Sequence, residues 1–355
     1  MLKTVPERAP KRAPKGARKT AQKATQGATQ PPVAATVAGW AALATAAAAA
    51  AAVLTAGAGD AAVGLALSRA GMDVAGVVVV GHTLLGALVP ARHKQAPAVL
   101  ARADRLVVIA AACWMTTTTL VIVHRVADAA GRPLTAVGAD ELISWSTALG
   151  AGQGLLLTAI AAALVLVGAV VRLHRPGLVP PPALLCAAAF VMITPAVTGH
   201  SATADQYQVI SVIGIGVHVA AAAAWVGGLG ALLVLVGPHR GLLVAVLPRF
   251  SQLATACIAA VTVTGVLTAA IHVGAGHGGW DAGWAMLRDS GWGHIVLAKA
   301  AALAGIGALG WLTRRRMAAS RMPLLRWAGF EVALMAVALG LAAALTQAPT
   351  HAVPG

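Results

Sequence analysis

Long apolar segments alternate with short polar ones along almost the whole chain. Those long enough to cross a bilayer lie at about residues 33–58, 72–90, 104–124, 150–173, 181–199, 209–236, 247–272, 293–313 and 323–346. A bilayer core about 30 Å thick is crossed by roughly 20 apolar residues in a helix. Because lipid offers no water to exposed backbone groups, such segments form helices. The pattern therefore predicts an all-α, polytopic transmembrane helix bundle with about nine spans.

The composition supports a membrane protein in contact with the lipid bilayer. Of the 355 residues, 59% are hydrophobic and only 10% are charged, whereas soluble domains carry about 25% charged residues. The chain has too few charges to cover the surface of an ordinary soluble enzyme.

The positive charges are distributed as the topology of a membrane protein requires. Eight of the 26 Lys and Arg residues lie in the first 23 positions. This basic segment has no apolar pattern, so residues 1–32 are predicted to be a disordered cytoplasmic tail that touches anionic lipid and not nucleic acid. Counted over the predicted loops, 21 of the 26 positive residues share the side of the N-terminus. The positive-inside rule thus places the N-terminus in the cytoplasm and the protein in the cell (cytoplasmic) membrane.

The predicted organisation has three parts: the tail at 1–32, a four-span region at 33–175 and a five-span region at 176–350. The apolar stretch at 33–58 is longer than the core of a signal peptide, so we expect it to be retained as the first span. Two outer loops are predicted at 128–148 and 273–292. The first contains a short interfacial helix around Asp140–Trp145.

Histidines carry most of the candidate chemistry. His82 and His218 lie about ten residues inside their predicted spans, roughly 15 Å deep at 1.5 Å per residue. A polar side chain at that depth is costly in hydrocarbon, which indicates a functional role, although a histidine that only packs against a neighbouring helix remains the alternative.

Potential metal ligands gather around the outer turn between the fifth and sixth spans. Met192 and His200 flank the end of one span, and His218 follows on the next. Imidazole binds copper, zinc and haem iron, and thioethers favour Cu(I). This spacing predicts a metal site.

The same region resembles a known protein family. TGH at 198–200, HVAAAAAWVGGL at 218–229, RFSQLA at 249–254, VTGVLTA at 263–269 and GHIVLAKAAALA at 293–304 follow in order. An Arg cluster at 314–316 and the apolar helix at 330–346 complete the succession. It is similar to the copper resistance protein D (CopD) family of bacterial membrane proteins over about residues 180–350, whereas the first four spans match no family in this comparison.

The resemblance implies a copper-handling protein, most simply one that takes up copper ions across the cytoplasmic membrane. Its metal ligands would be His200 and His218, with Met192 or His272 as a further ligand. No ATP-binding motif is evident, so we expect neither ATP-driven pumping nor enzyme activity. The chain lacks a Met-rich or His-rich outer domain, so a separate extracytoplasmic copper-binding protein is an expected partner.

Two alternatives remain open at this stage. His82 and His218 lie at similar predicted depth and could hold haem b between them, as in redox membrane proteins. The same copper ligands would also suit a factor that delivers copper to a respiratory oxidase during its assembly.

Overall fold

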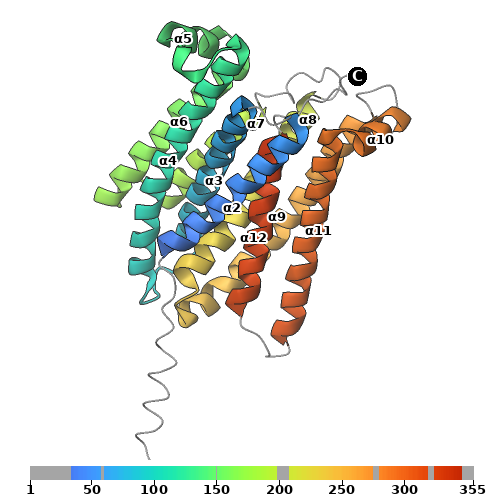
Figure 1. Cartoon of the computed structure of the whole chain (residues 1–355). Coiled ribbons are helices and arrows are strands. Elements are labelled where there is room, and N and C mark those ends of the chain that lie inside the picture. The colour runs from blue at the N-terminus through green and yellow to red at the C-terminus, as the bar shows by residue number, and fades with distance from the viewer. Residues whose placement is uncertain are drawn as a thin grey trace, which may run out of the picture.

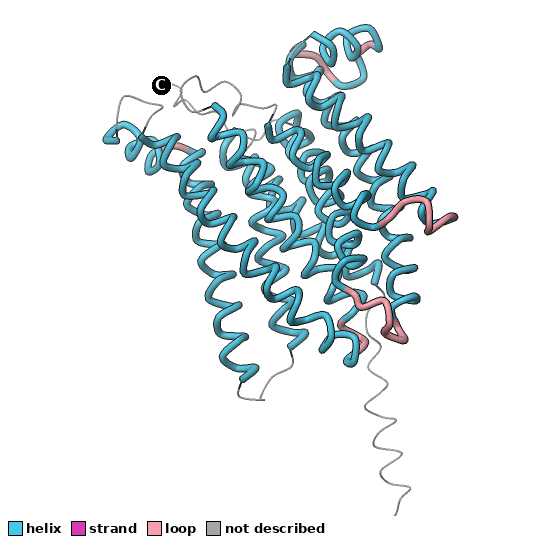
Figure 2. Tube along the Cα trace, turned by 180° about the vertical axis from the view of Figure 1, so that it is seen from behind, coloured by secondary structure: helices cyan, strands magenta, loops and turns pink. Residues whose placement is uncertain are grey.

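The computed structural model describes residues 33–56, 60–148, 150–197, 208–274, 280–318 and 324–345. These residues form helices joined by short connections, and none of them lies in a strand (Figure 2). The predicted disordered tail at 1–32 lies outside the described residues.

The helices follow the predicted spans in order. They are α2 (Val33–Ala56), α3 (Asp60–Leu88), α4 (Ala96–Ala130), η1 (Leu134–Ala136), α5 (Ala139–Ala148), α6 (Gly150–His174), α7 (Pro181–Val197), α8 (Gln208–Ala231), η3 (Leu232–Val236), α9 (Arg240–Gly274), α10 (Trp280–Asp289), α11 (Gly291–Ala318) and α12 (Leu324–Leu345). The segment η3 is π-helical and continues α8. The short helix predicted around Asp140–Trp145 is confirmed as α5.

The helical membrane bundle is confirmed. Among the described residues, six helices are long and apolar enough to cross a membrane, and they belong to α3, α4, α6, α8 with η3, α9 and α11. Three further helices, α2, α7 and α12, contain shorter apolar stretches of 10–17 residues. A count of nine spans and a cytoplasmic N-terminus stay predictions.

Helix α3 is longer than predicted. The expected start at residue 72 is wrong, because the helix already begins at Asp60. Arg69, which precedes the predicted span, therefore lies inside α3 and forms an i,i+4 ion pair with Asp73 at 3.4 Å. Pairing reduces the penalty of burying each charge, which lets the helix continue through both residues.

The bundle is organised around α3, which packs against α2, α4, α7, α8 and α12 (Figure 1). One hydrophobic cluster joins the first two-thirds of α3 to α4, α6 and α7. A second cluster joins the end of α3 to α8, η3, α9 and α12. The central helix thus contacts both halves of the chain.

The approach of α3 to α8 is very close. A Cβ atom added to Gly227 would overlap the carbonyl oxygen of Val77 and lie 3.0 Å from the Cα of Gly81. The next residue, Gly228, would meet the Leu84 side chain at 3.0 Å. A later residue of α8 thus contacts a later residue of α3, which means that the two helices run parallel. Small residues allow such contact between helices in lipid, where apolar burial gives little drive to associate.

The two ends of the bundle differ. Helices α5 and α10 lie at the same end (Figure 1), and α10 exposes Trp280 and Trp284, a residue type typical of membrane interfaces. At the other end, Arg172 forms a 2.9 Å ion pair with Asp104 and donates a hydrogen bond to the carbonyl oxygen of Val179. This pair connects α4 and α6 to the turn before α7.

The orientation is testable with reporters. A reporter fused after Arg326 should be cytoplasmic, and one inserted in the 275–290 loop should be outside, because the positive charges accumulate on the side of the N-terminus. Alkaline phosphatase and fluorescent-protein fusions measure this. The opposite location for either reporter would contradict the nine-span topology.

The glycine contact predicts a sharp difference between two alanine substitutions. Gly227→Ala should destabilise the protein by about 1–3 kcal/mol, because the new methyl group pushes α3 and α8 apart. Gly307→Ala is the matched control. A Cβ there meets nothing within 4 Å, so helix propensity should leave it neutral or stabilise it by up to about 1 kcal/mol. Thermal unfolding in detergent measures both, and equal stability of the two variants would contradict the close contact.

Candidate functional site

His218 lies on α8 and faces α9. Its Nδ1 atom is 3.0 Å from the hydroxyl oxygen of Thr264, and a Cβ added to the neighbouring Gly265 would lie 3.5 Å from its Cε1 atom. The imidazole is half-buried. A small residue beside a hydroxyl on α9 thus makes room for the ring and holds one of its nitrogens.

The hydrogen bonds indicate which nitrogen carries the proton. The Thr264 hydroxyl donates to the carbonyl oxygen of Ala260 at 2.6 Å, and a hydroxyl has one hydrogen to donate. The Thr264 oxygen must then accept a hydrogen bond from Nδ1–H of His218. With the proton on Nδ1, the lone pair of the neutral ring lies on Nε2. The ring also lies within hydrogen-bonding reach of the Val261 backbone. Histidines that bind metals are commonly fixed in this way by a partner on the other nitrogen.

A chain of charged side chains begins beside this histidine. Lys299 on α11 interacts electrostatically with both His218 and Asp73, and Asp73 is paired with Arg69. Charged side chains inside apolar helices are rare and usually mark a functional pathway. We call Arg69, Asp73, His218, Thr264 and Lys299 the outer polar cluster. It connects α3, α8, α9 and α11.

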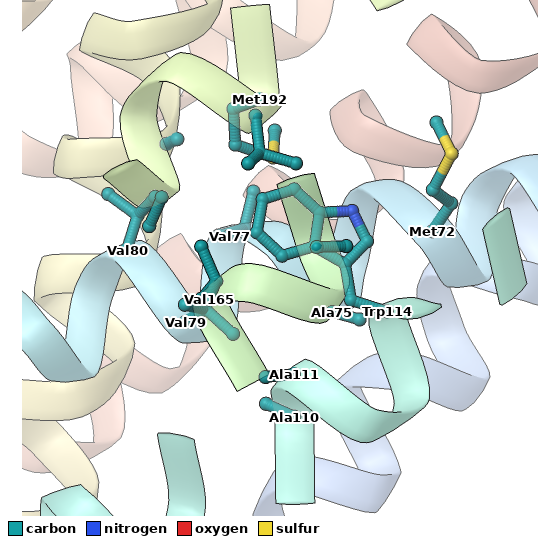
Figure 3. Packing of buried hydrophobic residues seen from close by; sticks show 14 of the residues in the cluster. Met72, Ala75, Val77, Val79, Val80, Ala110, Ala111, Trp114, Val165 and Met192 are labelled. Carbon is teal, nitrogen blue, oxygen red and sulfur yellow. The ribbon is translucent and has the colours of Figure 1, made fainter. Parts of the chain in front are cut away.

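Met192, a predicted metal ligand, does not lie beside His218. Its side chain is buried and belongs to the hydrophobic cluster of α3, α4, α6 and α7. A Cβ added to Gly76 would overlap the Met192 sulfur and approach the Trp114 ring at 2.8 Å. Figure 3 shows Met192 over Trp114. The thioether therefore packs in the core on α3 and α4, whereas His218 faces α9.

The other two predicted ligands are less defined. His200 lies outside the described residues. His272 belongs to α9, eight residues after Thr264 and therefore about 12 Å further along the helix, but its side chain is not among those described. Within the described part of the chain, no group of three or more His, Cys, Asp or Glu residues is arranged to hold a metal ion.

His82 and His218 lie at different depths, contrary to the prediction. Gly227 sits level with Val77 and Gly81, and His218 comes nine residues earlier on a parallel helix. At 1.5 Å per residue, His82 is therefore roughly 15–20 Å from the level of His218. Two histidines so far apart along the bundle cannot ligate one haem iron, so the predicted haem pair is wrong.

Comparison with known families gives matches in both halves of the chain. Residues 244–345 match the family model described as copper resistance protein D. Residues 58–207 match the model described as copper resistance protein D-like, N-terminal domain. No curated protein and no solved structure gives a match. The chain belongs to the copper resistance protein D family.

The two matches confirm the predicted resemblance to the copper resistance protein D family and extend it to the N-terminal half of the chain. The four-span region matched no family from its motifs, whereas residues 58–207 include α3, α4, α6 and α7. The outer polar cluster draws on both matched regions, with Asp73 from the first and Thr264 and Lys299 from the second. A copper-related function in the cytoplasmic membrane, for a multi-pass protein of this family, agrees with all these findings.

Some residues of the cluster were missed from the sequence. Thr264 lies within the VTGVLTA stretch that suggested the family, but threonines are common in membrane helices and its partner was not visible. Arg69 and Asp73 had a detectable signal, since an oppositely charged i,i+4 pair inside an apolar stretch favours a continuous helix.

Thr264 allows a test of how His218 is oriented. Thr264→Val removes the acceptor for Nδ1–H and should weaken Cu(I) binding about 10–100-fold, the usual effect of removing such a partner. Thr264→Ser should restore most of it. Competition with a chromophoric chelator measures the affinity of purified protein.

Thr262→Val is the matched control, because that exposed hydroxyl only donates to the carbonyl oxygen of Ile258. Unchanged Cu(I) affinity in Thr264→Val would show that Thr264 does not orient a copper ligand.

Proposed function

We propose that this copper resistance protein D family member carries copper ions inward across the cytoplasmic membrane, without covalent catalysis. The observation that supports this most is His218. Its Nδ1 lies 3.0 Å from the Thr264 hydroxyl oxygen, and with the proton on Nδ1 the ring offers the Nε2 lone pair as a neutral Lewis base inside the bundle. Neutral imidazole suits copper among the transition metals.

The proposed ligands are His218 and His200, with His272 as a further donor. His200 precedes α8, and His272 lies near the end of α9, which packs against α8. We leave Met192 out of this set, because its sulfur packs against Trp114. An extracytoplasmic copper-binding protein would hand the ion to these histidines.

Electrostatics support inward passage of a singly charged ion. Lys299 lies near His218 and also interacts with Asp73, which is paired with Arg69. A positive charge on Lys299 would weaken the retention of a copper cation at His218. The membrane potential, negative inside, contributes about 2.3 kcal/mol per unit charge per 100 mV and favours uptake over export.

The ligand assignment predicts a loss of function that does not involve loss of the fold. His218→Ala and His200→Ala should each abolish copper uptake at unchanged abundance in the membrane, because the remaining ligand holds copper too weakly. Residual copper per purified protein should be lower in His218→Ala than in His200→Ala, since water replaces a ligand less easily inside the bundle than at its rim. Cellular copper accumulation and copper per purified protein measure this.

His239→Ala is the control, because His239 lies in the turn between η3 and α9 at the opposite end of α8. It should behave as wild type. Full copper loading in both His218→Ala and His200→Ala would refute the site. If cells with His218→Ala or His200→Ala accumulate as much copper as wild-type cells but their respiratory oxidase loses copper, a role in copper delivery to the oxidase would be favoured.

A further inference from the structure

His82 is a buried histidine that the outer polar cluster does not use. Only 4% of it is exposed. Its Nδ1 atom is 2.8 Å from the carbonyl oxygen of Val78, and its Nε2 atom has no hydrogen-bond partner among the described residues. Because a carbonyl oxygen only accepts hydrogen bonds, Nδ1 carries the proton. The lone pair therefore lies on a buried Nε2 that nothing satisfies.

Two cavities meet at this residue. The first lies between α2, α3, α8 and α12, and its lining includes Trp40, Val74, Val226 and Val332 besides His82. The second lies between α3, α4, α6 and α7, and its lining includes Thr83, Asp104 and Arg172 besides His82. His82 thus lies between an apolar cavity and one lined partly by polar side chains and partly by apolar ones, which we call the polar cavity.

The cavities extend in opposite directions from His82. The apolar cavity reaches Val74, which follows Asp73 of the outer polar cluster, about 12 Å from His82 along α3. The polar cavity reaches the Asp104–Arg172 ion pair, close to the start of α4 and the end of α6. His82 therefore stands between the outer polar cluster and the opposite end of the bundle.

None of the polar neighbours offers a hydrogen to Nε2. The Thr83 hydroxyl oxygen lies 2.9 Å from the carbonyl oxygens of Val79 and Val80, which compete for its single hydrogen. Arg172 is occupied by Asp104 and Val179. A buried acceptor without a donor destabilises the fold, and such exceptions call for an explanation. Transient binding of a Lewis acid, such as a metal ion, to Nε2 would explain why the nitrogen is left without a donor.

We propose that Nε2 of His82 is a transfer ligand for Cu(I) between the outer polar cluster and the cytoplasmic side. This inference rests on the proposed copper uptake. His82 resembles His218 in that an oxygen atom of the protein lies within hydrogen-bonding distance of Nδ1. A single neutral nitrogen binds the ion weakly, and passage requires intermediate sites that release it.

The test uses full-length protein in liposomes, with Cu(I) kept reduced by ascorbate and an entrapped chelator to report its arrival. His82→Leu should lower the maximal uptake rate at least tenfold, while the KM and the copper bound per protein stay near wild type. His82→Met, which keeps a soft ligand, should retain most of the rate. Thermal stability of His82→Leu should equal or exceed that of wild type, because the unsatisfied nitrogen is gone.

His174→Leu is the matched control. His174 makes the same i−4 bond, from Nδ1 to the carbonyl oxygen of Val170 at 2.9 Å, but is exposed, so its uptake should be unchanged. A wild-type rate in His82→Leu would overturn the proposal, as would equal loss of rate in His82→Leu and His82→Met, since the imidazole would then have a packing role.

Failure of the proposed function gives a different result from failure of this inference. If wild-type protein moves no copper, or if His218→Ala moves it normally, the uptake site itself is refuted. If His218→Ala is inactive and His82→Leu is not, only the role of His82 is refuted.

Discussion

The close contact between α3 and α8 determines how the functional residues are arranged. Gly81 and Gly227 allow the two backbones to touch, and lipid provides no hydrophobic force to replace such packing. The contact joins the region that matches the N-terminal domain model to the helix that precedes the second match. It also fixes the register of the two helices. His218 consequently lies close to the level of Asp73 along the bundle, whereas His82 lies roughly 15–20 Å from the level of His218.

Most helices of this fold follow from hydropathy, because lipid makes helix formation depend mainly on a sufficient length of apolar sequence. The beginning of α3 was an exception. Arg69 and Asp73 end the apolar stretch in sequence, yet their mutual ion pair lets the helix continue to Asp60 in the structure. Hydropathy sums side chains one at a time and does not include such pairing. The same limit applies to α4, which extends beyond the predicted 104–124 to Ala96 and Ala130.

The site was only partly predictable. A histidine deep in an apolar helix is a strong signal, and it identified His218 and His82. Their partners depend on which helices pack together and in what register, so Thr264 and Asp73 could not be assigned from sequence. Met192 shows the opposite error. A thioether is a soft metal ligand, but it is also the side chain best suited to fill irregular gaps, and beside Gly76 and Trp114 it fills one.

Neutral imidazoles solve a problem that charged ligands would create for a cation in a membrane. A carboxylate deep in the bundle would bind copper strongly but would need its own compensation when the ion leaves. At His218 and His82 an oxygen of the protein lies against Nδ1. In the proposed transport, a neutral Nε2 would therefore bind and release an ion without a change in the charge of the protein. The charged residues of the outer polar cluster compensate one another in part, with Asp73 between Arg69 and Lys299. In the proposed transport, weak retention at His218 is the condition for movement of the ion toward His82.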